Sequence, residues 1–142
     1  MKGIAFLSAL CFLLISLLIG NYNCGRSSDA EHNYKIIIQP EGVTITATSG
    51  TILNQMYFVD LTDDNKSVPN AGLNITSSIG PPKIELFNPV TNDSSSPLII
   101  RTDDSGTGKF KVKITVDSNY TTTITASFGS ATTSTSIDVE LL

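Results

Sequence analysis

The body of this chain alternates apolar and polar residues with a period of two. The alternation is clearest in four segments, residues 43–48, 110–116, 120–128 and 137–141. Successive side chains of a strand point to opposite faces, so the pattern predicts strands with one buried face and one exposed face. The expected inward rows include Phe110, Val112, Ile114 and Val116 in one segment and Tyr120, Ile124, Ala126 and Phe128 in another. No segment after residue 33 shows a helical period.

About nine strands are expected in all, because five further segments have strand character. These segments are residues 34–39, 53–61, 72–77, 84–87 and 98–102. Runs rich in Gly, Pro, Asn and Asp separate the strands, as at 63–65 and 103–108. Short strands at this spacing favour an all-β fold, an immunoglobulin-like antiparallel β-sandwich. A closed β-barrel is the alternative.

Two of the strands are joined by a very short connection. Only Asp117, Ser118 and Asn119 separate the segments 110–116 and 120–128. A loop of this length is typical of a β-hairpin, so we expect the two strands to be neighbours in one sheet. Their apolar rows would then line the same side of that sheet, and the domain would fold without a metal or a disulfide.

The first residues predict an export signal. Lys2 is followed by an apolar run over residues 4–19 that only Ser8 and Ser16 interrupt. This run is shorter than the roughly 18 residues that a membrane-spanning helix needs. We therefore expect residues 1–23 to be a cleaved signal peptide, with an uncleaved signal anchor as the alternative.

The cysteines add to this picture. Cys11 lies inside the apolar run, so removal of the signal leaves Cys24 as the only thiol. A lone Cys between an apolar core and a polar segment resembles a bacterial lipoprotein precursor. The resemblance implies a lipid on Cys24. Residues 25–33 contain no apolar residue except Ala30, so we expect a flexible tether over residues 24–33 and a folded domain over residues 34–142, where the alternation begins. The protein would then sit in the bacterial cell envelope, at the outer membrane or cell surface.

The segment before Cys24 departs from the usual lipoprotein pattern. Asn21 and Asn23 stand where that family has Leu and a small residue. A competing cleavage site follows Ala30, and its use would give a secreted soluble domain without lipid.

Motifs in the body resemble the bacterial Ig-like domains of invasin- and intimin-type surface proteins. They are Val59-Asp60-Leu61, Val68-Pro69-Asn70-Ala71-Gly72-Leu73-Asn74-Ile75, Thr102-Asp103-Asp104-Ser105-Gly106-Thr107-Gly108 and Thr123-Ile124-Thr125-Ala126-Ser127. The similarity spans residues 43–139, although the segment from Ile79 to Pro97, with four prolines, does not follow the family. The resemblance implies one Ig-like sandwich that works in adhesion or surface structure.

Residues with catalytic or metal-binding chemistry are scarce. His32 is the only imidazole and falls in the predicted tether, so no Ser-His or Cys-His pair can form and we assign no catalytic residue. The acidic groups of 60–64 and 103–104 could offer oxygen ligands to calcium. Asp in turns more often bonds its own backbone, so we predict no metal site and no cofactor.

Composition narrows the choice of partners. The net charge is -4 and the nine basic residues are scattered, which argues against a nucleic-acid partner. We therefore expect a non-enzymatic, lipid-anchored envelope module for adhesion or surface structure, with a protein or a surface polysaccharide as its partner. The alternatives are an accessory subunit of an envelope complex and a calcium- or carbohydrate-binding module.

Overall fold

A computed structural model describes residues 31–142, so the predicted signal peptide, Cys24 and most of the predicted tether lie outside the described residues. Residues 32–142 form one compact unit. Its strands are β1 (Tyr34–Gln39), β2 (Val43–Ala47), β3 (Thr51–Asp63), β4 (Lys66–Ser67), β5 (Gly72–Ser77), β6 (Ile84–Phe87), β7 (Leu98–Arg101), β8 (Thr107–Val116), β9 (Tyr120–Phe128) and β10 (Ala131–Leu141). No helix within residues 31–142 is long and apolar enough to cross a membrane.

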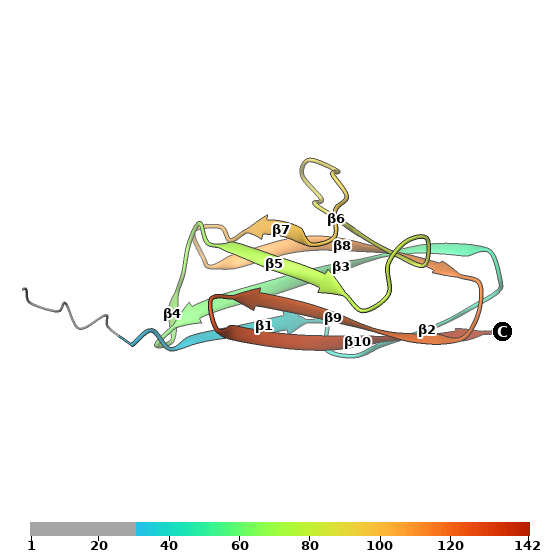
Figure 1. Cartoon of the computed structure of the whole chain (residues 1–142), viewed down its shortest axis with the longest axis horizontal. Helices are drawn as coiled ribbons and strands as arrows, with labels where there is room; N and C mark the ends of the chain where they lie inside the picture. Colours follow the sequence, from blue (N-terminus) through green and yellow to red (C-terminus); the bar gives the residue numbers. More distant parts are fainter. Residues whose placement is uncertain (1–30) are drawn as a thin grey trace, which may run out of the picture. The chain divides into compact units, whose positions relative to one another are not determined.

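The strands form two sheets that pack face to face (Figure 1). Sheet A has the order β1-β3-β8-β6, and the short β4 also pairs with β3. Sheet B has the order β2-β10-β9-β5-β7. All pairs are antiparallel except β2 with β10, which run parallel. The fold is therefore the all-β, Ig-like sandwich that the alternation predicts, and the barrel alternative is wrong because two separate sheets form.

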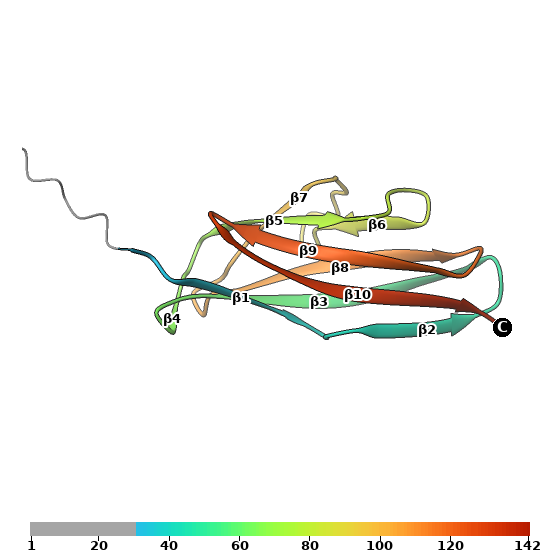
Figure 2. The ribbon, with the colours of Figure 1, turned by 60° about the horizontal axis from the view of Figure 1, so that its bottom comes forward.

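The topology matches an Ig domain closely, with one departure. Sheet A has the order of Ig strands A, B, E and D, and sheet B contains the counterparts of G, F and C. The chain changes sheets between β1 and β2, along one edge of the sandwich (Figure 2). The departure lies after β5. The chain leaves sheet B to form β6 in sheet A and then returns to sheet B, where β7 pairs with β5. This additional crossing occupies the segment 79–97 that does not follow the family resemblance.

The core lies between the sheets, where the inward rows meet. The predicted row Phe110, Val112, Ile114 and Val116 is fully buried, and the ring of Phe110 stacks on Tyr57 of β3 with 5.3 Å between ring centroids. In the second predicted row, Ile124 and Ala126 are buried and Tyr120 and Phe128 are half-buried. Both rows therefore face the core, as the alternation predicts.

The expected hairpin between β8 and β9 is wrong. β8 pairs with β3 and β6 in sheet A, whereas β9 pairs with β10 and β5 in sheet B. Both edges of each strand are thus taken by other partners, and neither strand has an edge left for the other. Residues 117–119 instead cross from one sheet to the other. The two apolar rows consequently face each other across the core rather than lying side by side.

Candidate functional site

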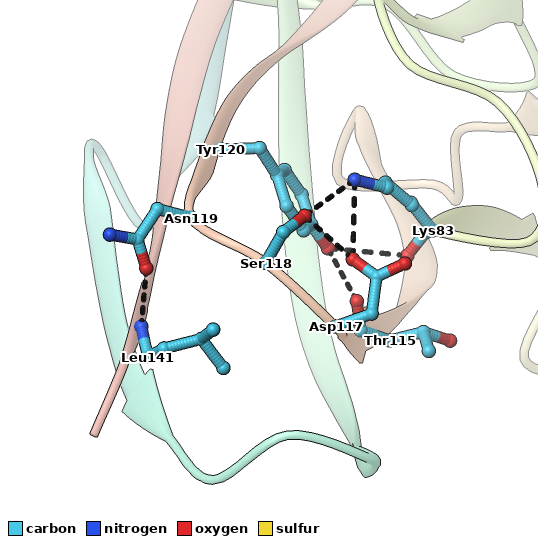
Figure 3. Close-up of polar contacts among 7 residues, drawn as sticks. All are labelled: Lys83, Thr115, Asp117, Ser118, Asn119, Tyr120 and Leu141. Atoms are coloured by element: carbon cyan, nitrogen blue, oxygen red, sulfur yellow. Dashed lines mark hydrogen bonds and ion pairs between the residues drawn. The ribbon is translucent and has the colours of Figure 1, made fainter.

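The crossing between β8 and β9 carries a cluster of polar contacts (Figure 3). The ammonium of Lys83 donates to Ser118 Oγ at 2.7 Å and forms an ion pair with Asp117 Oδ1 at 3.2 Å. Ser118 Oγ in turn donates to Asp117 Oδ1 at 2.9 Å. At the end of the crossing, Asn119 Oδ1 accepts a 2.7 Å bond from the backbone N–H of Leu141. The cluster therefore joins β8, β9, β10 and the segment before β6.

Tyr120, the first residue of β9, completes this corner. Its hydroxyl donates to the carbonyl of Thr115 at 2.9 Å, and the ammonium of Lys83 lies 4.9 Å from its ring centroid. A Tyr at the start of this strand that bonds back to the preceding strand is the tyrosine corner of Ig folds. Burial, and then the charge of Asp117, raise the pKa of Tyr120. Tyr120 was predicted only as a core residue, although its position directly after a three-residue connection could have indicated this corner.

The contact between Lys83 and Ser118 has the composition of a base and a nucleophile. A catalytic lysine must lose its proton, which requires an apolar surrounding or a neighbouring cation. Lys83 has neither of these surroundings, because its side chain is partly exposed and paired with the carboxylate of Asp117. The hydrogen bond from Ser118, followed by that from Lys83, lowers the pKa of Asp117. In this arrangement the side chains of Lys83, Asp117 and Ser118 bond one another and hold the corner together.

Two of the acidic residues considered as calcium ligands, Asp103 and Asp60, accept hydrogen bonds from within the sandwich, and Asp103 does so within its own turn. Asp103 Oδ1 accepts bonds from the backbone N–H groups of Ser105 at 2.9 Å and Thr107 at 3.0 Å, and from Ser105 Oγ at 2.6 Å. These bonds, led by that of the Ser105 side chain, lower the pKa of Asp103. Asp60 Oδ1 accepts from Thr107 Oγ1 at 2.6 Å. Within residues 31–142, no group of three or more His, Cys, Asp or Glu side chains is placed to hold a metal.

The last residues of the predicted tether contact the sandwich. His32 Nδ1 lies 2.5 Å from Asp63 Oδ2, and the ring of His32 stacks on Tyr34 with 5.2 Å between centroids. The backbone N–H of Asn33 donates to Asp63 Oδ1 at 2.9 Å. No partner of His32 was predicted, because Asp63 is far away along the chain and comes close to His32 only through the pairing of β1 with β3.

The outer face of sheet B is rich in hydroxyl groups. Thr121, Thr123 and Thr125 of β9 lie opposite Asp138, Ser136 and Ser134 of β10. Some of these side chains bond across the strands, as Thr121 Oγ1 does to Asp138 at 2.8 Å and Thr125 to Ser134 at 3.0 Å. The outer face of sheet B therefore presents hydroxyl groups, together with the carboxylates of Asp138 and Glu140 on β10.

The outer face of sheet A has the opposite character. On β3 the outward residues Ile52, Met56 and Phe58 are 56%, 36% and 42% exposed, which is high for large apolar side chains. On the neighbouring β8, the outward residues are Lys109, Lys111 and Lys113, with Phe58 opposite Lys109 and Met56 opposite Lys111. We call these six residues the basic face. The alternation of residues 110–116 predicts that Lys111 and Lys113 point outward, but Lys109 and the outward apolar residues of β3 were not predicted.

One small pocket opens beside β6. It has a volume of about 240 Å³, and its lining includes Ile79, Ile84, Leu86 and the serines of 94–96. The one charged side chain in the lining, Glu85, is paired with Lys113 at 2.8 Å. The pocket is below the usual size of a ligand site.

Comparisons with known proteins give only distant similarities. No protein-family model and no curated protein matches this sequence. Domains 4 and 5 of the S-layer protein SbsC are 17% identical with a TM-score of 0.46, and the match covers 77% of this chain and 53% of that one. A structure of SbsC domains 1–6 is 18% identical with a TM-score of 0.49, and the match covers 78% of this chain and 13% of that one.

An Ig domain is also among the similar structures. The complex of titin M10 with obscurin-like 1 is 7% identical with a TM-score of 0.37, and the match covers 78% of this chain and 96% of that one. This chain thus spans about half of the two-domain S-layer structure and a small part of the longer one. Similarities at this level carry no information on function, so the fold assignment rests on the strand order and the tyrosine corner.

Proposed function

We propose that this protein is a non-enzymatic structural module of a bacterial cell surface, held at a membrane by a lipid on Cys24. The structural role is supported by one observation: the polar side chains of the clusters bond to one another or to their own turns. The side chains of Lys83, Asp117 and Ser118 bond one another across the β8–β9 corner, and Asp103 bonds its own turn. Groups engaged in this way stabilise the sandwich and have little capacity left for a substrate.

The proposed location rests on the sequence before the domain. An apolar run precedes Cys24, and a polar segment follows it up to the compact unit that starts at His32. Eight residue steps of extended chain span at most about 30 Å, so a lipid on Cys24 would keep the sandwich near the membrane. Two or three acyl chains would suffice to hold it there. Adhesion, with a protein or a surface polysaccharide as partner, is the role that this location favours.

Substitution of the two cysteines tests the anchor. Cells that express the chain are grown with an alkyne-bearing fatty acid, and incorporation of the label into the protein is measured. We expect label in the wild type and in Cys11→Ser, which is the matched control because Cys11 is removed with the signal. We expect no label in Cys24→Ser, together with release from membranes or a block in processing. A mature chain that begins at Glu31 without acyl mass would overturn the lipid anchor.

A further inference from the structure

The basic face combines two features that a solvent-exposed sheet surface rarely shows together. It holds three lysines on one strand of a protein whose net charge is -4. Beside them it exposes Ile52, Met56 and Phe58, three of the large apolar side chains that remain most exposed in the described residues. An apolar row beside a cationic row, on a protein with net negative charge, indicates a binding surface. Its partner would have an anionic layer next to an apolar layer.

The lysines are positioned so that their charge points outward. Only Lys113 has a carboxylate partner among the described residues, namely Glu85 at 2.8 Å. Lys109 and Lys111 instead place their ammonium groups above aromatic rings, 5.9 Å from the ring centroid of Phe58 and 5.1 Å from that of Phe87. Lys111 also donates a 3.5 Å hydrogen bond to Asn92 Oδ1, and, after the side-chain hydrogen bond from Ser105, the charge of Lys109 contributes to the lowered pKa of Asp103. The methylene stems of Lys109 and Lys111 therefore lie along apolar surface while the charged ends remain available to anions.

We infer that the basic face docks on the anionic headgroups of a phospholipid bilayer. Lysine is depleted in protein–protein interfaces, which argues against an acidic protein as the partner. At a bilayer, lysine ends can contact the phosphates while Phe, Met and Ile side chains enter the headgroup boundary. Anionic lipids also attract each lysine close to the surface.

This inference rests on the proposed anchor, which would keep the sandwich within about 30 Å of the membrane. An anchored domain has a high local concentration at the bilayer, so a weak surface is sufficient for docking. Sheet A would then lie on the membrane. The hydroxyl-rich face of sheet B, with Asp138 and Glu140 on β10, would point away from it.

The test places a fluorescent reporter on each outer face of the full chain. Met56→Cys and Thr123→Cys each receive an NBD label, because the mature wild-type chain has no other thiol than Cys24, which the lipid blocks. Each protein is reconstituted into vesicles of phosphatidylcholine, with and without phosphatidylglycerol. We expect a blue-shifted emission from position 56 only when phosphatidylglycerol is present, and no shift from position 123 in either lipid.

A charge variant and salt complete the test. Lys109→Glu should abolish the shift at position 56, whereas Lys66→Glu, an equal charge change at an exposed lysine outside the basic face, should preserve it. High salt should also abolish the shift, because exposed charges are then screened. The inference is overturned if both positions shift alike, if pure phosphatidylcholine gives the same shift, or if position 56 is covered only when envelope proteins are added.

Failure of the anchor and failure of the docking are separable in this design. Intact mass before labelling shows whether Cys24 carries lipid. If it does not, the anchor is overturned, and the same labelled positions in a Cys24→Ser background still report on docking to added vesicles. A lipidated chain whose position 56 shows no shift overturns the docking alone.

Discussion

Tyr120 binds Thr115 across the corner of the sandwich: the phenol at the start of β9 donates to a carbonyl near the end of β8, at 2.9 Å. The two residues belong to different sheets, because β8 lies in sheet A and β9 in sheet B. The bond therefore fixes the point at which the chain passes from one layer to the other. Asp117 and Lys83 close the same corner from outside (Figure 3).

Removal of this phenol should destabilise the domain. Tyr120→Phe deletes the bond and leaves the carbonyl of Thr115 without its partner, so we expect a loss of about 1 kcal/mol in the free energy of unfolding. Urea denaturation measures the change. A midpoint equal to that of the wild type would show that the corner bond contributes nothing.

The same substitution at Tyr57 should have the opposite sign. Tyr57 is fully buried, and its hydroxyl has no hydrogen-bond partner in the described structure. A buried hydroxyl without a partner is unfavourable, so Tyr57→Phe should raise the free energy of unfolding by about 1 kcal/mol. Because both variants lose one phenol oxygen, each serves as the control for the other in the same denaturation experiment.

Tyr57 also predicts a loss of stability in alkaline solution. Burial raises the pKa of Tyr57 to about 12, above its ordinary value of 10.0. Between these values the unfolded chain loses the proton and the folded chain keeps it. Stability should thus be intact below pH 10 and fall by about 1.4 kcal/mol per unit as the pH rises towards 12. Denaturation across this range should show a smaller decline for Tyr57→Phe, and equal declines would contradict the assignment.

The inward row of β8 predicts a contrast between neighbouring residues. Ile114 is fully buried, so Ile114→Ala should open a cavity and cost about 2 to 5 kcal/mol. Lys113, the next residue, lies outside and forms a partly exposed ion pair with Glu85. Lys113→Ala should cost less than about 1 kcal/mol. Thermal and urea unfolding of both variants measures the two losses in the free energy of unfolding. Similar losses would contradict the assignment of the buried and exposed faces of β8.

Two glycines allow a test of close packing at equal backbone geometry. Gly50 and Gly106 both have positive φ values, of 86° and 80°. A Cβ at Gly106 would lie 2.9 Å from the carbonyl oxygen of Leu61 and 3.1 Å from the backbone nitrogen of Val68, whereas a Cβ at Gly50 meets nothing within 4 Å. Gly50→Ala should cost about 1 to 2 kcal/mol. Gly106→Ala should cost a further 1 to 3 kcal/mol, about the effect of overpacking, and equal losses would count against the clash.

Much of the strand pattern was predictable from the sequence. The bounds of β1, β5, β6 and β9 agree with the expected segments, because turn-forming residues limit each of them. The two-residue β4 was not predicted, since so short a strand has no periodicity. It follows Asp64 and Asn65, whose positive φ values of 48° and 63° fit a tight hairpin turn after β3.

Sheet membership and the surfaces were not predictable in the same way. The alternation of apolar and polar residues predicts which side of β8 and of β9 is buried. It does not predict which sheet each strand belongs to, because an apolar row can face the core from either sheet. The three-residue connection fits a hairpin or a crossing, and the choice depends on strands distant in sequence that occupy the edges. The basic face was hidden for a related reason, because Lys109 meets Phe58 only through the pairing of β8 with β3.

The parallel pairing of β2 with β10 has a mechanical consequence. Val43 to Ala47 run alongside Ile137 to Leu141 in the same direction, so the strand nearer the start of the domain lies against its last strand. A pull applied to the domain through its two ends would slide these strands past each other. Their hydrogen bonds would then bear the force together instead of opening one after another. A domain pulled in this way would thus resist extension at β2 and β10, its second strand and its last.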